Sequence, residues 1–122
     1  MSTQPEKEID PQSIPFGLLE LDADWTVLYF KPEGGEGDGD SRLVGRNLLT
    51  EIPVVARAAG LRDRLHRFRR GHAPADSFLH IFPLEHGDVQ AKILLARLHE
   101  RSALGSTESI LLHIRKPSQP PL

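Results

Sequence analysis

The order of hydrophobic periods along the chain is the feature that most constrains its fold. Two segments with alternating apolar residues, Phe16 to Asp22 and Trp25 to Lys31, come before a stretch with helical spacing. Three more, Ser77 to Leu84, Val89 to His99 and Ser109 to Arg115, follow it. A period of two predicts β-strands. A hairpin, then helices, then three sequential strands indicate an α+β domain, in which the helices pack on one face of a five-stranded antiparallel sheet.

The middle of the chain is predicted to be helical. Ser41 is a candidate N-cap for a short helix through Val44, and RNLLTEI predicts a second short helix before Pro53. A longer helix is expected from Val54 to Arg70. Gly60 lies inside it and costs about 1 kcal/mol relative to alanine, so we expect a break there.

The 122 residues fit one domain. Residues 1–13 and 116–122 are polar and rich in proline, which predicts flexible tails around a domain at residues 14–115. No apolar run approaches the roughly 20 residues of a bilayer span, and the first residues do not resemble a secretory signal. We therefore expect a cytoplasmic protein without a membrane partner.

The charge balance predicts no nucleic-acid partner. The formal net charge is -2 and the pI is about 6.3. Six arginines nevertheless crowd residues 57–70. The simpler interpretation is a solvated helix face above an apolar stripe of Leu61, Leu65 and Phe68. The alternative is a surface for an acidic partner.

The sequence contains no motif of a known enzyme. It has no cysteine, no Gly-x-Ser-x-Gly motif, and no two histidines three or four residues apart. The acidic, glycine-rich stretch Pro32 to Ser41 lacks the ligand order of a calcium loop. We therefore expect neither a metal site nor catalysis, and an unrecognised enzyme remains the less favoured alternative.

Several segments resemble the PAS domain family. The stretch FGLLELDADWTVLYF is similar to the opening hairpin of photoactive yellow protein and its PAS relatives, and LVGRNLL is similar to the short helix that follows a glycine-rich loop there. The match continues through FRRG, FLHIFPL and AKILL, and covers most of residues 16–115. The resemblance implies a PAS-like fold and a role in signal transduction.

The resemblance does not extend to photochemistry. Val54 or Val55 stands where the photoactive yellow proteins have the cysteine that carries their coumaroyl chromophore. Phe30 stands in place of a tyrosine that binds the phenolate, and the matching glutamate falls near Gly34. Valine cannot form the thioester, so a photoreceptor of this type is excluded.

PAS domains can hold a ligand between helices and sheet, and here that space would be almost wholly apolar. Its predicted lining is Leu28, Phe30, Leu48, Val55, Phe68, Phe78, His80, Phe82 and Ile93. His80 is the main polar group, which favours a small apolar ligand with one hydrogen bond, or alternatively a satisfied core histidine. We expect no cofactor; the alternative is a haem sensor that uses His66, His72 or His80.

The opposite face of the sheet is also expected to carry apolar side chains, among them Phe16, Leu18, Leu94, Leu98 and Leu111. Such a face needs a cover, either the N-terminal segment or another protein. We favour a homodimer, or else a signalling partner. The sequence thus predicts a non-enzymatic sensor or protein-interaction module.

Overall fold

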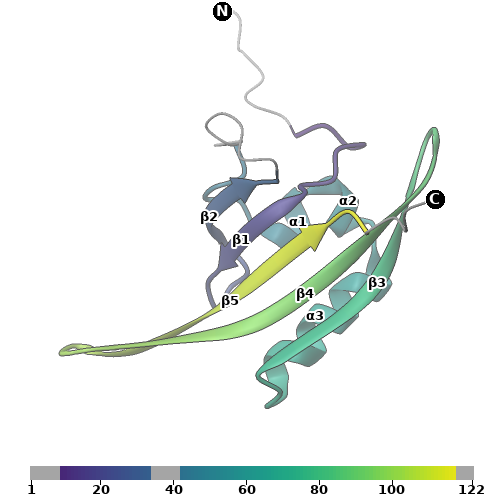
Figure 1. Ribbon diagram of the computed structural model, residues 1–122. Helices are drawn as coiled ribbons and strands as arrows, with labels where there is room; N and C mark the ends of the chain where they lie inside the picture. Colours follow the sequence, from purple (N-terminus) through teal and green to yellow (C-terminus); the bar gives the residue numbers. More distant parts are fainter. Residues whose placement is uncertain (1–8, 34–41, 118–122) are drawn as a thin grey trace, which may run out of the picture.

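The computed structural model describes residues 9–33 and 42–117 (Figure 1). Strands β1 (Gly17–Leu21) and β2 (Val27–Pro32) form the first hairpin. Three helices follow: α1 (Leu48–Glu51), α2 (Pro53–Ala56) and α3 (Ala59–Arg70). Strands β3 (Ala75–Leu84), β4 (Gly87–Ser102) and β5 (Gly105–Arg115) complete the described part of the chain.

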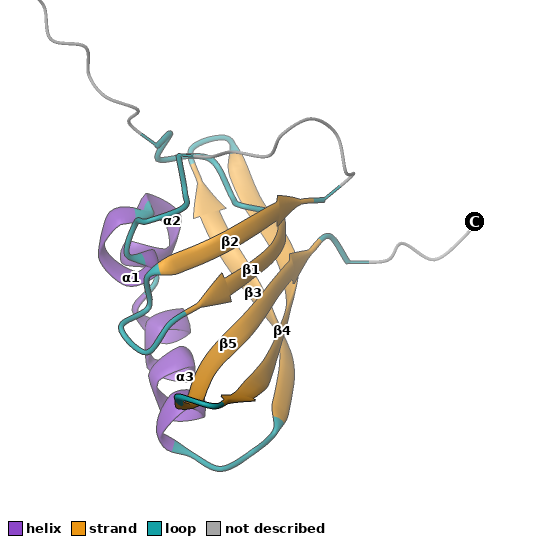
Figure 2. Cartoon of the chain, turned by 90° about the vertical axis from the view of Figure 1, so that its left-hand side faces the viewer, coloured by secondary structure: helices purple, strands orange, loops and turns teal. Residues whose placement is uncertain are grey.

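The five strands form one antiparallel sheet in the order β2-β1-β5-β4-β3. The last strand therefore lies in the middle, beside the first, and β2 and β3 are the edges. Figure 2 shows the helices together on one side of this sheet. The predicted α+β, PAS-like architecture is confirmed.

The core lies between the helices and one face of the sheet. Every second residue of the central strands faces it, including Leu19, Ile93 and Leu112, each no more than 2% exposed. Leu48 of α1 and Leu65 of α3, both fully buried, cover them from the other side. The alternating pattern of the sequence thus marks the inner face correctly.

The turn between β1 and β2 is held by the carboxylate of Asp22. One oxygen of this side chain accepts hydrogen bonds from the backbone N–H groups of Asp24, at 2.8 Å, and Thr26, at 2.9 Å. These bonds fix the chain around Trp25, which has a φ of 68° although it carries a side chain. The indole is buried, so core packing and the aspartate turn together stabilise an unfavourable backbone conformation.

The inward orientation predicted for Leu28 is wrong. Glu20 pairs with Tyr29 and Leu21 pairs with Val27, so Leu28 is an extra residue in a β-bulge. A bulge shifts the alternation by one residue, and Leu28 is therefore 48% exposed. Val27 takes its place in the core.

The helical region differs from the prediction in two places. Residues 42–46 form turns instead of a helix, and the side chain of Asn47 caps α1 by accepting hydrogen bonds from two backbone N–H groups. The predicted long helix is interrupted at Ala58, not at Gly60. Ala58 donates its N–H to the carbonyl of Val55, which closes α2, while its own carbonyl accepts from Arg62 to begin α3.

The hairpin of β4 and β5 is longer than predicted. Its ladder continues to the pair Ser102 and Gly105, and in Figure 1 it extends well beyond the rest of the sheet. Leu104 at its tip is 98% exposed.

The described part of the expected N-terminal tail lies against the domain. Ile9 packs on the core, and the side-chain oxygen of Gln12 accepts a hydrogen bond from the N–H of Glu85 at 2.7 Å. No helix within residues 9–33 and 42–117 is long and apolar enough to cross a membrane. Most of the stretch considered for calcium, residues 34–41, lies outside the described residues.

Candidate functional site

The structure fills most of the predicted ligand space with side chains. Five of the nine predicted residues are at most 5% exposed and belong to the core: Leu48, Val55, Phe68, Phe82 and Ile93. Phe30 and Phe78 pack at its margin. Leu28 faces away, as described above.

A small cavity remains beside His80. Its volume is about 100 Å3, and it lies between β3 and the junction of α2 with α3. The helical side supplies Val54, Arg57 and Ala58, and the strand supplies His80 to Pro83. The helical wall of the cavity is therefore formed by α2 and by the interruption that separates it from α3.

Among the described residues that line this cavity, His80 carries a buried polar atom that makes no hydrogen bond. Its Nε2 atom is buried and has no hydrogen-bond partner among the described residues. The imidazole contacts the ring of Phe82 edge to face, with 4.6 Å between the ring centres. Burial lowers the pKa of His80 below its usual value of 6.5, so the neutral imidazole is favoured.

A buried, unpaired imidazole nitrogen is unfavourable by about 1–3 kcal/mol. A ligand or a water molecule that hydrogen-bonds to Nε2 would recover part of this free energy. An engineered apolar cavity of about 150 Å3 holds benzene, so a cavity near 100 Å3 suits a smaller, largely apolar body. Val54, Ala58 and Phe82 provide the apolar contacts, and Arg57 adds a cation at the wall.

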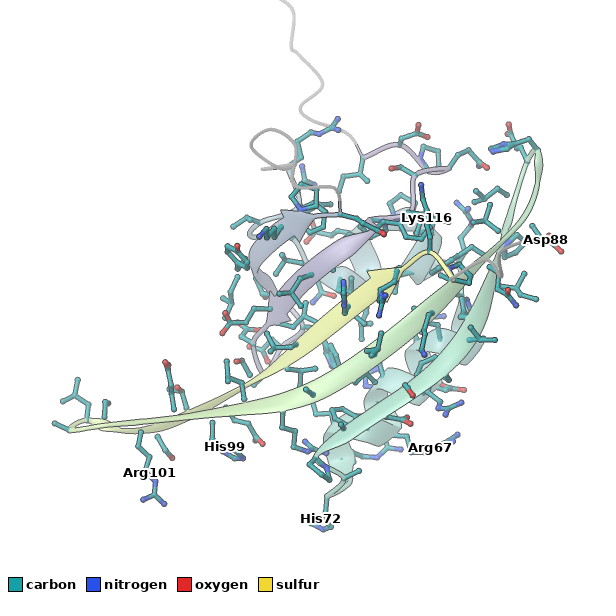
Figure 3. The ribbon with its side chains drawn as sticks, viewed as in Figure 1. Arg67, His72, Asp88, His99, Arg101 and Lys116 are labelled. Carbon is teal, nitrogen blue, oxygen red and sulfur yellow. The ribbon has the colours of Figure 1, made fainter. Side chains whose placement is uncertain are left out.

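The histidines considered for haem do not converge. His66 lies against the indole of Trp25, with 5.8 Å between ring centres, and His72 is exposed beyond the end of α3 (Figure 3). His80 lines a cavity far smaller than a porphyrin. The geometry around these three residues does not fit haem. Within the described residues there is also no group of three His, Cys, Asp or Glu side chains that could hold a metal ion.

The outer face of the sheet carries a second, larger hollow. An open groove of about 510 Å3 lies over β3, β4, β5 and β1, and its apolar lining includes Leu18, Leu94, Ala96 and Leu111. Phe16, predicted to join this face, instead packs against the core together with Ile9 and Ile14.

The predicted lining lacks five of the seven cavity residues: Ile81 and Pro83 on β3, and Val54, Arg57 and Ala58 on the helical side. In the sequence, Val54 stands out only as a residue in the place of a chromophore cysteine, and in the structure it lines the cavity. Arg57 is one arginine of a charged run, and no sequence pattern marks Ala58. Their positions follow from the break between α2 and α3, which the sequence pattern placed two residues too late.

Comparisons with known proteins identify the fold only. No protein-family model matches the chain, and no curated protein matches it. Among solved structures, the Vibrio cholera VqmA–ligand–DNA complex is similar, with a TM-score of 0.51 and 16% sequence identity. The match covers 85% of this chain and 46% of the VqmA chain, so this chain corresponds to less than half of that protein.

The comparison corrects one expectation from the sequence. The charge balance predicted no nucleic-acid partner, but the similar structure is a complex with DNA. A fold of this kind therefore occurs in a protein that binds DNA, and the pI of this chain does not exclude nucleic acid. What the strand order and the structural similarity establish together is a PAS-like α+β fold.

Proposed function

We propose that this chain is a non-enzymatic PAS-type sensor module whose cavity beside His80 binds a small, largely apolar ligand with one hydrogen-bonding group. The observation that carries the proposal is the Nε2 atom of His80, which is buried and has no hydrogen-bond partner among the described residues, in a residue that lines the cavity. The similar VqmA structure contains a ligand, which agrees with ligand binding in a protein that has this fold.

The ligand proposal is tested by titration with isobutanol, a probe with a compact apolar body and one hydroxyl group. We expect the NMR signals of the His80 ring to shift as the hydroxyl bonds to Nε2. His80→Phe should weaken binding by about tenfold or more, because a hydroxyl group buried without a partner loses its hydrogen bond. His86→Phe is the control, since His86 lies in the exposed turn between β3 and β4. Equal binding by all three proteins would contradict the proposal.

The same variants test the burial of His80. The pKa of His80 is lowered in the folded protein, so the unfolded chain binds the proton more readily. The contribution of neutral His80 to stability is therefore complete above about pH 6.5 and is lost as the pH falls below it. His80→Phe should lose part of this acid sensitivity in thermal melts, and His86→Phe should retain it. Some sensitivity should persist in both, since burial also lowers the pKa of His113.

We further propose that the outer groove is an interface between two copies of the chain. Leu18, Leu94 and Leu111 make it apolar, and no described N-terminal residue before Leu18 lines it. We expect light scattering to show a dimer. Leu94→Asp should weaken dimerisation by about tenfold or more, since a carboxylate would be buried without a partner. Leu104→Asp, at the remote hairpin tip, should leave it unchanged. A monomeric parent protein would refute this part of the proposal.

A further inference from the structure

Strand β3 offers a free sheet edge. Among the described residues it pairs with β4 alone, and it lies last in the strand order. Proteins usually protect such edges with lysine, proline or a bulge. From Ser77 to Ile81, β3 has none of these, and its ladder with β4 is continuous. Leu79 and Ile81 are 58% and 52% exposed.

The position of Pro83 shows which backbone groups face the free edge. Pro83 stays in register opposite Asp88 although it has no N–H to donate. A proline is tolerated in a strand where the N–H would point away from the partner strand. In an antiparallel ladder this direction alternates, so the N–H groups of Ile81 and Leu79 point the same way. Two N–H groups in the middle of β3 are thus directed toward an added strand.

Basic side chains of α3 and its preceding turn line the same side of the molecule. A groove of about 280 Å3 between α3 and the start of β3 is lined by Arg64, Arg67 and His72. Farther along β3, Arg57 lines the cavity beside His80. Figure 3 shows Arg67 projecting from α3 past the edge that β3 forms.

Some of this charge is already neutralised inside the groove. The Nε atom of Arg64 lies 3.4 Å from a carboxylate oxygen of Asp76, and its guanidinium stacks 4.0 Å from the centre of the Phe78 ring. Arg67 and Arg57 have no ion pair with any described residue. The net charge of the groove therefore remains positive, with Arg64 held in place along the strand.

We infer that the edge of β3 binds an extended, acidic segment of a partner protein as an additional strand. The backbone of the segment would bond to β3, alternate apolar side chains would lie beside Leu79 and Ile81, and carboxylates would face Arg57 and Arg67. The positive charge of the groove favours an acidic segment, and the outward N–H groups of β3 favour an extended segment that can accept hydrogen bonds from them. Single-stranded nucleic acid is less suited, because His72 offers the one exposed ring among the described residues that line the groove, while Phe68 there is only 5% exposed. This inference goes beyond the ligand proposal and does not depend on it.

The test uses a fluorescent peptide that alternates glutamate and valine, with fluorescence anisotropy as the measurement. We expect the peptide to bind the full chain and binding to weaken with salt. Arg67→Glu should weaken it by about tenfold or more, because the charge is reversed at the groove. Arg101→Glu is the matched control on the distant hairpin of β4 and β5, and it should change binding by less than about twofold.

A second pair of measurements tests strand addition itself. Leu79→Pro removes one outward N–H and should abolish binding, while its melting temperature shows whether the fold is intact. A peptide methylated on alternate backbone nitrogens tests the same point on the unaltered protein, and it should not bind. Failure of the first peptide to bind, or equal binding by the methylated peptide, would overturn the inference. So would tight binding of oligothymidylate, sensitive to Arg67→Glu, without binding of the peptide.

Discussion

Replacing Arg97 with alanine is expected to lower the free energy of unfolding by about 2–4 kcal/mol. The guanidinium of this residue, on β4, ties the end of α3 to the sheet. It donates hydrogen bonds to the carbonyl oxygens of Phe68, Gly71 at 2.8 Å, and Ala73 at 2.7 Å. It also lies 4.4 Å from the centre of the Phe68 ring.

The effect is large because alanine would leave carbonyl groups at the end of α3 without their hydrogen-bond donor. The last carbonyls of a helix have no partner within the helix, and they carry partial negative charge. Arg97 bonds with one cation to the carbonyl of Phe68 in the last turn and to those of Gly71 and Ala73 just beyond it, and its side chain is only 12% exposed. Its ion pair with the exposed Glu108, at 3.9 Å, should add little.

Urea unfolding measures the change, with two comparisons. Arg97→Lys should recover only part of the loss, because an ammonium group cannot reach three carbonyls with the geometry of a guanidinium. Arg101→Ala, on the exposed end of the same strand, should change stability by less than about 0.5 kcal/mol. If Arg97→Ala proved as stable as Arg101→Ala, the end of α3 would not depend on this contact.

The sequence pattern predicts the strands well because each has one buried face. Phe78, His80 and Phe82 alternate with exposed residues, and the structure places all three toward the helices as expected. The same reasoning fails at Leu28. There the run Val27 to Phe30 is apolar throughout, so both registers of β2 look equally favourable until the bulge is known.

Polar contacts between residues far apart in the sequence could not be predicted, for a different reason. The carbonyl groups that accept from Arg97 lie between 24 and 29 residues earlier in the chain. Nothing in the local sequence marks one arginine among many for this task. The cavity shows the same limit: the inward position of His80 was predictable, whereas Arg57 and Ala58 meet it only because of the break between α2 and α3.

Gly17 is the position where a single methyl group should be most damaging. Its φ is +146°, a conformation that residues with side chains rarely adopt. A Cβ atom there would overlap the carbonyl oxygen of Lys31 and would lie 2.8 Å from the Cα of Pro32. Both atoms belong to the backbone of β2, so neither can rotate away. Gly17→Ala should therefore force the first hairpin apart at its open end.

We expect Gly17→Ala to lower the free energy of unfolding by about 3–5 kcal/mol, through strain and displaced strand pairing together. Gly60→Ala is the matched control: Gly60 lies in the first turn of α3, and an added Cβ meets no atom within 4 Å. That change should instead stabilise the protein by about 0.5–1 kcal/mol, since alanine favours the helix and restricts the unfolded chain. The two substitutions add the same methyl group. If urea unfolding shows that Gly17→Ala lowers the free energy of unfolding and Gly60→Ala raises it, the difference comes from the backbone conformation and surroundings of each glycine and not from the added methyl group itself. A Gly17→Ala protein as stable as its parent would mean that β1 and β2 do not approach as closely as described.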